Sequence, residues 1–186
     1  MKTINKDIKD IEFTDLLKLQ KQLDEEVAKP RDNGFVPRER TLLDIKLALD
    51  DEFQEWLREL PKELNFKTWK EKEYKREDEL IEITDCLFFF LQLFNRQEIK
   101  QEYWFEWCEE EFNEFQKDKN KDYTFSSEVE YFKESLWEED YHDCFCTWVS
   151  ICRLRGFTKD EIVNQYLKKW KENISNRIKG EWSNEK

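Results

Sequence analysis

The stretch that decides the fold runs from residue 78 to residue 93 and reads DELIEITDCLFFFLQL. From Cys86 onward it is apolar almost all round, which is the pattern of a helix buried inside a protein. At 3.6 residues per turn, Glu82, Asp85 and Phe89 share one stripe of this helix, so both carboxylates are expected to point inward. A buried anion needs a partner, and no Lys or Arg lies on the stripe to provide one.

A second acidic pair lies within residues 47–60, LALDDEFQEWLREL, which have the period of an amphipathic helix. The apolar arc of this helix comprises Ile45, Ala48, Leu49, Phe53, Trp56 and Leu60. Glu52 falls inside the arc and Glu55 lies at its edge. Acidic pairs that face one space repel strongly, and a bound divalent cation relieves that repulsion. Mg²⁺ suits carboxylates that also receive phosphate oxygens, so we expect Glu52, Glu55, Glu82 and Asp85 to bind Mg²⁺.

Composition limits the possible folds and chemistries. The chain has 186 residues, which suits one domain, and 16% of them are aromatic, which is enough to build a core. Only 3 Gly and 3 Pro are present, which favours long helices over a sheet with tight turns. No Gly-rich phosphate loop exists, and the single histidine argues against Ser-His or Cys-His catalysis.

Charge and cysteine content indicate the setting in which the chain works. A net charge of −12 argues against binding to a nucleic acid polymer, because neutralisation of phosphates drives such binding. A single nucleotide can still bind through metal ions. The 5 cysteines are odd in number, and Cys86, Cys146 and Cys152 lie in apolar runs, which predicts a reducing, cytoplasmic location. The N-terminal residues lack the apolar core of a signal peptide, and the longest apolar run is too short to span a membrane.

Helical periodicity extends over most of the chain. It predicts helices over residues 12–28, 41–60, about 77–98, 101–116, 141–155 and about 158–178. Thr14 is a candidate cap of the first of these helices, and two candidate capping boxes, Ser127-x-x-Glu130 and Thr158-x-x-Glu161, would open later helices. No strand pattern is convincing. We therefore expect an all-α fold with four core helices and additional helices between the third core helix and the C-terminal pair.

The run His142–Cys146, HDCFC, is a weak candidate for a metal site. It lacks a second Cys-x-x-Cys pair, and we expect the surrounding segment to be helical. A helix separates side chains that are two positions apart, so we do not expect zinc there.

These motifs together resemble a known family. A Gln in the first helix, E-x-x-E, the aromatic and lysine cluster of residues 66–70, and E-x-x-D on a Phe-rich helix are similar to the all-α NTP pyrophosphohydrolases, which include MazG-like relatives. Within that superfamily, the chain most resembles the dimeric all-α dUTPases, over roughly residues 15–95 and 141–182. The resemblance implies one all-α domain over residues 1–186, with residues 96–140 as a candidate insertion subdomain.

The resemblance also implies roles for individual residues. Glu52 would be the general base beside the metal ligands. The residues that would shape the pyrimidine pocket are Gln20, Asp24, Trp69 and Phe89. Those that would hold the phosphates are Lys67, Lys70, Lys169, Asn173 and Arg177.

The implied activity is Mg²⁺-dependent hydrolysis of dUTP to dUMP and pyrophosphate, which keeps uracil out of DNA. dUDP is a further candidate substrate, and the implied assembly is a homodimer in which the partner subunit helps to complete each site. Two alternatives stay open. The same metal site could act on dCTP or a non-standard dNTP, because one sequence does not separate uracil from cytosine. The chain could instead be a non-catalytic acidic helical protein that binds a regulatory partner through residues 96–140.

Overall fold

The described part of the chain is helical. The computed structural model describes residues 4, 6–97, 112 and 124–179, and for residues 177–179 it describes the backbone alone. The elements are a short 3-10 helix, η1 (Ile8–Asp10), and the helices α1 (Phe13–Val27), α2 (Leu42–Glu59), α3 (Arg76–Gln97), α5 (Phe125–Trp137), α6 (Tyr141–Leu154) and α7 (Lys159–Lys179). No strand occurs in these ranges, so the all-α prediction is confirmed. Except for residue 112, the helix predicted over 101–116 lies outside them.

The helix starts confirm one predicted cap and correct two others. Thr158 and Glu161 form the predicted capping box before α7, with N–H···O distances of 2.9 and 3.2 Å. α1 begins at Phe13 and is capped by Glu12, so the prediction of Thr14 as its cap is wrong. α5 begins at Phe125, and its cap is Thr124 rather than Ser127.

The error at α5 has a local cause. The hydroxyl oxygen of Thr124 accepts a hydrogen bond from the backbone N–H of Ser127 at 3.2 Å, so Ser127 lies inside the first turn. The earlier start brings Phe125 into the helix, where its ring contacts that of Trp56 at a centroid distance of 5.9 Å. The motif Ser127-x-x-Glu130 gave no sign of this earlier start of α5, which goes together with the packing of Phe125 on Trp56.

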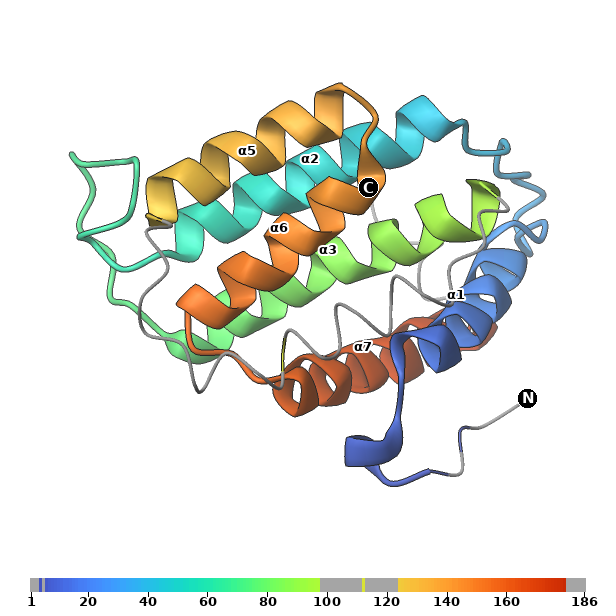
Figure 1. Ribbon diagram of the computed structural model, residues 1–186. Coiled ribbons are helices and arrows are strands. Elements are labelled where there is room, and N and C mark those ends of the chain that lie inside the picture. The colour runs from blue at the N-terminus through green and yellow to red at the C-terminus, as the bar shows by residue number, and fades with distance from the viewer. Residues whose placement is uncertain (1–3, 5, 98–111, 113–123, 180–186) are drawn as a thin grey trace.

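α3 occupies the middle of the helical bundle. Figure 1 shows α2 and α5 on one side of it and α1 and α7 on the other, and α3 contacts α1, α2, α6 and α7. This position explains why the sequence of α3 is apolar almost all round. Aromatic rings fill the space between the helices: Phe53 of α2 stacks on Phe132 of α5 at 3.7 Å, and Phe90 of α3 meets Phe145 of α6 edge-on at 5.2 Å.

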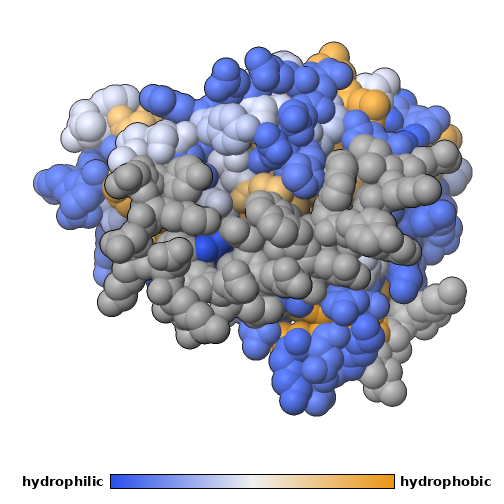
Figure 2. Space-filling view, in the orientation of Figure 1, coloured by the Kyte–Doolittle hydropathy of each residue, from blue (hydrophilic) through white to orange (hydrophobic). Residues whose placement is uncertain are grey.

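The outside of the molecule is mostly polar. Figure 2 shows blue, hydrophilic residues over much of the visible described surface, with apolar residues in separate spots. Among the helices of the described ranges, none is long and apolar enough to cross a membrane.

A buried ion pair connects three of the helices. Glu79, near the start of α3, is fully buried and accepts hydrogen bonds from Arg155 at 2.7 and 3.0 Å, where α6 ends. Trp56 of α2 donates to the same carboxylate at 3.3 Å, and Tyr74 donates to it at 2.8 Å. Both carboxylate oxygens therefore have donors, which is the condition for keeping a charge in a core.

Replacement of Arg155 with Met should be strongly destabilising, because it leaves the Glu79 carboxylate buried without its cation. We expect the free energy of unfolding to fall by about 3 kcal/mol. Urea denaturation followed by circular dichroism measures this. Lys18→Met is the control, because Lys18 is exposed and its distance to Asp15 is 3.9 Å. Equal stabilities of the two variants would show that the buried pair does not hold the helices together.

Candidate active site

Packing of α2 along α3 brings three carboxylates together. Glu52 comes from α2, and Glu82 and Asp85 come from successive turns of α3. Each offers an oxygen that lies within 4.8 Å of the other two. Glu55, one turn along α2, is outside this group, since its side chain is 48% exposed and lies 3.8 Å from Arg58. Its role as a metal ligand stays a prediction.

Mutual repulsion and burial make these carboxyl groups unusually weak acids. Burial, assisted by the negative charge of Asp85, raises the pKa of Glu52 to about 7 and that of Glu82 to about 7. Burial also raises the pKa of Asp85, against the opposing charge of Lys169. Near neutral pH Glu52 and Glu82 are therefore only partly ionised, and a further cation would favour their ionised forms.

Asp85 holds one oxygen ready for a ligand. Its Oδ2 forms an ion pair with the ammonium group of Lys169 on α7. Its Oδ1 is buried, and no donor among the described residues reaches it. An unsatisfied buried oxygen is rare and calls for an unseen partner. Together with two neighbouring carboxylates it offers the oxygen donors that Mg²⁺ or Mn²⁺ prefers, so the donor set fits such a cation.

Glu52 and Asp85 lie in the wall of a cavity of about 990 Å³. The other lining residues come from α1, from the segment between α1 and α2, from α3 and from α7: Lys21, Leu23, Asp24, Glu25, Val27, Ala28, Arg31, Pro37, Arg38, Glu39, Arg40, Phe88, Phe89, Gln92, Asn95, Arg96, Lys169 and Asn173. The volume is enough for a nucleotide-sized ligand.

The lining of this cavity includes two aromatic rings and the carboxylate of Asp24. Phe88 and Phe89 both line it, and the guanidinium of Arg40 lies 5.6 Å from the centre of the Phe89 ring. Asp24 lines it too, and burial raises the pKa of Asp24 to about 6. Flat apolar rings beside an acceptor suit a heterocyclic base.

Gln20 lies behind Asp24 and does not line the cavity. It is fully buried, it accepts a hydrogen bond from the hydroxyl of Tyr166 at 3.0 Å, and it donates to Asp24 at 2.8 Å. In this arrangement Gln20 orients Asp24. The predicted direct contact of Gln20 with a base stays a prediction.

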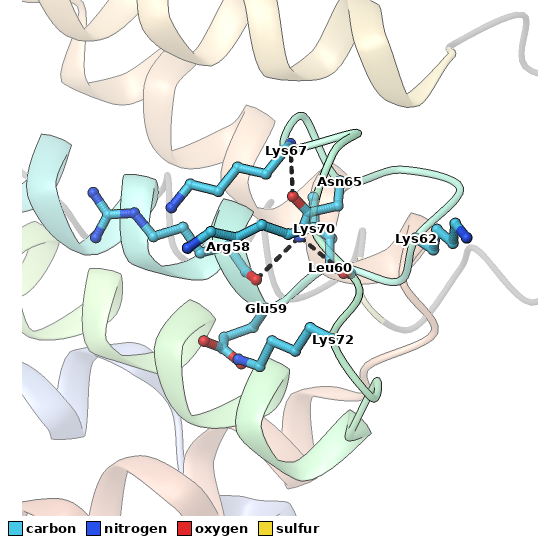
Figure 3. A pocket seen from close by; sticks show the side chains of 8 residues that line it. All are labelled: Arg58, Glu59, Leu60, Lys62, Asn65, Lys67, Lys70 and Lys72. Atoms are coloured by element: carbon cyan, nitrogen blue, oxygen red, sulfur yellow. Dashed lines mark hydrogen bonds and ion pairs between the residues drawn. The ribbon is translucent and has the colours of Figure 1, made fainter.

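A separate basic cleft of about 180 Å³ lies at the end of α2. Its cations are Arg58, Lys62, Lys67, Lys70 and Lys72. Figure 3 shows Arg58, Lys67 and Lys70 extending side by side in one direction, with Lys62 pointing the other way. Trp69 lines neither this cleft nor the large cavity, and it is 73% exposed.

The comparison with protein families decides the relationship. The family model described as dUTPase matches residues 12–181. The chain belongs to the dUTPase family. The match covers both acidic pairs, the cavity walls and the basic cleft, and it confirms the all-α dUTPase resemblance read from the sequence. No curated protein matches the chain.

The last helix reaches the site of this dUTPase family member through two of the three predicted residues. Lys169 and Asn173 are one turn apart on α7, and both line the large cavity. The side chain of Arg177 lies outside the described residues.

Some cavity residues were not anticipated from the sequence. Gln92 is hidden in an apolar run, and the arginines at 31, 38, 40 and 96 lie outside the family motifs. A signal was available for Gln92, because it falls on the same helical stripe as Asp85 and Phe89.

A second group of potential metal ligands, Asp140, His142 and Asp143, has local structural roles. Asp140 caps α6 by accepting a hydrogen bond from the backbone N–H of Asp143 at 3.1 Å. The carboxylate of Asp143 accepts from Tyr131 at 2.6 Å and lies 3.1 Å from the Nδ1 atom of His142. These contacts account for one oxygen of Asp140 and both oxygens of Asp143 without a metal ion.

The raised pKa of Glu82 predicts a pH-dependent stability for the metal-free protein. An unfolded Glu ionises near 4.5, whereas the folded group ionises near 7, so ionisation destabilises the native state increasingly between these values. Glu82→Gln removes this effect. We expect it to raise the free energy of unfolding by about 1 kcal/mol at pH 8 and to change little at pH 5. Urea denaturation in EDTA measures both, and an equal effect at the two pH values would contradict the repulsion.

Proposed function

We propose that the protein hydrolyses dUTP to dUMP and pyrophosphate in a Mg²⁺-dependent reaction. The observation that carries the proposal is the group formed by Glu52, Glu82 and Asp85 at the edge of a base-sized cavity, with Asp85 Oδ1 unsatisfied. Membership of the dUTPase family supports the substrate class. Glu55 would join the ligand set by turning from Arg58.

The layout of charges suggests how a nucleotide would lie. Its base would enter the cavity beside Asp24 and Phe89, and its phosphates would pass the carboxylates toward the basic cleft. α2 links these parts, because it carries Glu52 in the wall of the large cavity and Arg58 in the basic cleft, six residues apart, with Glu55 between them. Glu52 and Arg58 are separated by about 9 Å along the helix axis, which a triphosphate can reach across.

Different residues of the chain would have different roles in the hydrolysis. Bound Mg²⁺ would supply positive charge that neutralises phosphate oxygens and activates water for attack. Glu52 would accept the proton of the attacking water, and its pKa of about 7 suits a general base at neutral pH. Lys67 and Lys70 would hold phosphate oxygens, as would Asn173 and Arg177 of α7.

Lys169 would have two successive roles. In the free protein its ammonium group is the counter-ion of Asp85. With a cation held by Asp85, the Lys169 ammonium group would be repelled and would turn to a phosphate oxygen of the substrate. The exchange keeps each buried charge compensated in both states.

Other substrates remain within the scope of the proposal. The Asp24 carboxylate can accept from the amino group of cytosine as well as from the ring N–H of uracil, which favours dCTP as the second candidate. dUDP would occupy the same base cavity with a shorter phosphate chain. Release of pyrophosphate from dUTP, dCTP and dTTP, and of phosphate from dUDP, with and without Mg²⁺, separates these possibilities. It also separates both enzymes from a non-catalytic binding protein.

We also propose a cytoplasmic homodimer, as the resemblance implies. Leu43 and Leu47 lie one turn apart on α2 and are 54% and 47% exposed, which gives that helix an uncovered apolar edge. A surface of this kind is usual where subunits meet. Light scattering after gel filtration measures the mass of the particle. A regulatory partner would bind through residues 96–140, most of which lie outside the described ranges.

Glu52→Gln should abolish most of the turnover, because an amide accepts no proton from water. We expect kcat to fall by about 10²- to 10⁴-fold. Pyrophosphate release at saturating dUTP and Mg²⁺ measures it. Glu63→Gln is a matched control on the exposed connection after α2, outside the group and both cavities, and it should keep wild-type turnover. Wild-type turnover in Glu52→Gln would remove Glu52 from the mechanism.

Lys169→Met should strengthen the binding of Mg²⁺ to the nucleotide-free protein several-fold, because the competing ammonium group is lost from Asp85. The same variant should bind dUTP more weakly, because a phosphate contact is lost. Calorimetric titration with Mg²⁺ and with a non-hydrolysable dUTP analogue gives both affinities. Unchanged Mg²⁺ affinity would show that Lys169 does not compete for the carboxylate.

A further inference from the structure

Gln92 lines the large cavity two turns beyond Asp85 on α3, and no family motif includes it. Its side chain is well buried, and its Oε1 accepts a hydrogen bond from Nη1 of Arg40 at 3.0 Å. A guanidinium group only donates, so the end of the amide that faces Arg40 must be the oxygen. The amide nitrogen therefore points away from Arg40 and makes no hydrogen bond within the described residues.

Asp24, on the same cavity, is oriented by a second amide. The Gln20 amide nitrogen donates to Asp24 Oδ1 at 2.8 Å, and the Gln20 oxygen is fixed by the Tyr166 hydroxyl at 3.0 Å. This leaves Asp24 Oδ2 as an acceptor at the cavity wall. Asp24, Arg40 and Gln92 all line the same cavity. The guanidinium of Arg40 donates to Gln92, and its charge acts to lower the pKa of Asp24 against the rise that burial causes.

The wall of one cavity thus offers an amide donor, Gln92, and a carboxylate acceptor, Asp24, each fixed by its own hydrogen bond. A uracil ring presents an N3–H donor next to the O4 acceptor. Cytosine presents the opposite order at these positions, with N3 as an acceptor and the N4 amino group as a donor. A donor and an acceptor held in fixed orientation can therefore distinguish the two bases.

We propose that Gln92 is a specificity-determining residue that donates to O4 of the pyrimidine while Asp24 accepts from N3–H, and that Arg40 is the positioning residue that fixes the Gln92 amide. The inference rests on the proposed function, since it concerns the base of the same nucleotide substrate. It assigns the preference for uracil over cytosine to the direction of one buried amide.

Binding of dUMP and dCMP in EDTA tests the inference without the metal or the reaction. Calorimetry should show that the wild-type protein prefers dUMP. Gln92→Leu removes the donor and should weaken dUMP binding about tenfold, with a smaller effect on dCMP. Gln92→Glu keeps a partner for Arg40 but presents an acceptor to the base, so the ratio of the two affinities should fall further and move toward dCMP.

The ratio of the affinities for dUMP and dCMP also tests the role of Arg40. Arg40→Met frees the amide to turn, so the preference for dUMP should fall, whereas Arg40→Lys retains a donor and should preserve it. Gln22→Leu is the matched control, because Gln22 does not line the cavity, and it should bind both nucleotides as the wild type does. Melting temperatures of all variants identify any loss of folding.

The results of these experiments distinguish a failure of the role proposed for Gln92 from a failure of the proposed function. A wild-type protein that neither binds deoxyuridine nucleotides nor hydrolyses dUTP would overturn the proposed function. A wild-type protein that prefers dUMP, with the same preference in Gln92→Leu and Gln92→Glu, would overturn the role of Gln92 alone. A preference lost in the Gln92 variants but kept in Arg40→Met would overturn the role of Arg40.

Discussion

The burial of carboxylates on the central helix is the constraint on which the rest of the structure depends. α3 is enclosed by α1, α2, α6 and α7, yet it carries Glu79 and Asp85 among its buried residues. At Glu79 the surrounding helices supply donors to both oxygens. At Asp85 they supply one cation and leave the other oxygen unsatisfied. The hydrogen-bonding capacity of Glu79 is therefore satisfied by the protein itself, whereas that of Asp85 requires a ligand.

The last helix connects this unsatisfied group to the first helix. Lys169 of α7 reaches Asp85, and Tyr166, one turn earlier, reaches Gln20 of α1. Trp170 adds a hydrogen bond to the backbone oxygen of Leu19 at 2.8 Å. One face of α7 therefore contacts α1, contributes to the cavity wall and compensates the charge on α3. A ligand that displaces the Lys169 side chain from Asp85 would leave α7 in place, because Tyr166 and Trp170 still bind α7 to α1.

The helices, and the side of each helix that is buried, were predictable from the sequence, because both depend on residues that are close together along the chain. Periodicity placed α2, α3 and α7 within a few residues, and the two acidic pairs fell on stripes that do turn inward for Glu52, Glu82 and Asp85. The stripe pattern did not reveal the cation that pairs with Asp85. No cation lies on either stripe, but Lys169 lies 84 residues after Asp85 and arrives from another helix.

Residues that act through long-range contacts were likewise hidden. Arg155 has no local signal of its role, because its partner Glu79 lies 76 residues away. Gln92 shares the stripe of Asp85, but its partner Arg40 lies 52 residues away and could not be inferred from that stripe. Trp69 is a different case. Tryptophan near lysines indicated a site wall, and this stays a prediction, because the side chain is 73% exposed and lines neither the large cavity nor the basic cleft. The connection between α2 and α3 has no periodic pattern from which its direction could be inferred.

The distribution of charge gives the acidic protein a way to bind an anionic ligand. The chain carries −12 overall, and three carboxylates stand where the phosphates of the proposed substrate would pass. Arginines line the large cavity on one side of that group, and the lysines of the basic cleft lie on the other side, in the connection that follows α2. Positive charge at both ends cannot cancel the repulsion at the centre, because Coulomb energy falls with distance and is screened by water. Lys169 offsets the charge of Asp85 alone, whereas a cation bound between the three carboxylates would act on all of them at contact distance, so the nucleotide is expected to enter together with its metal ion.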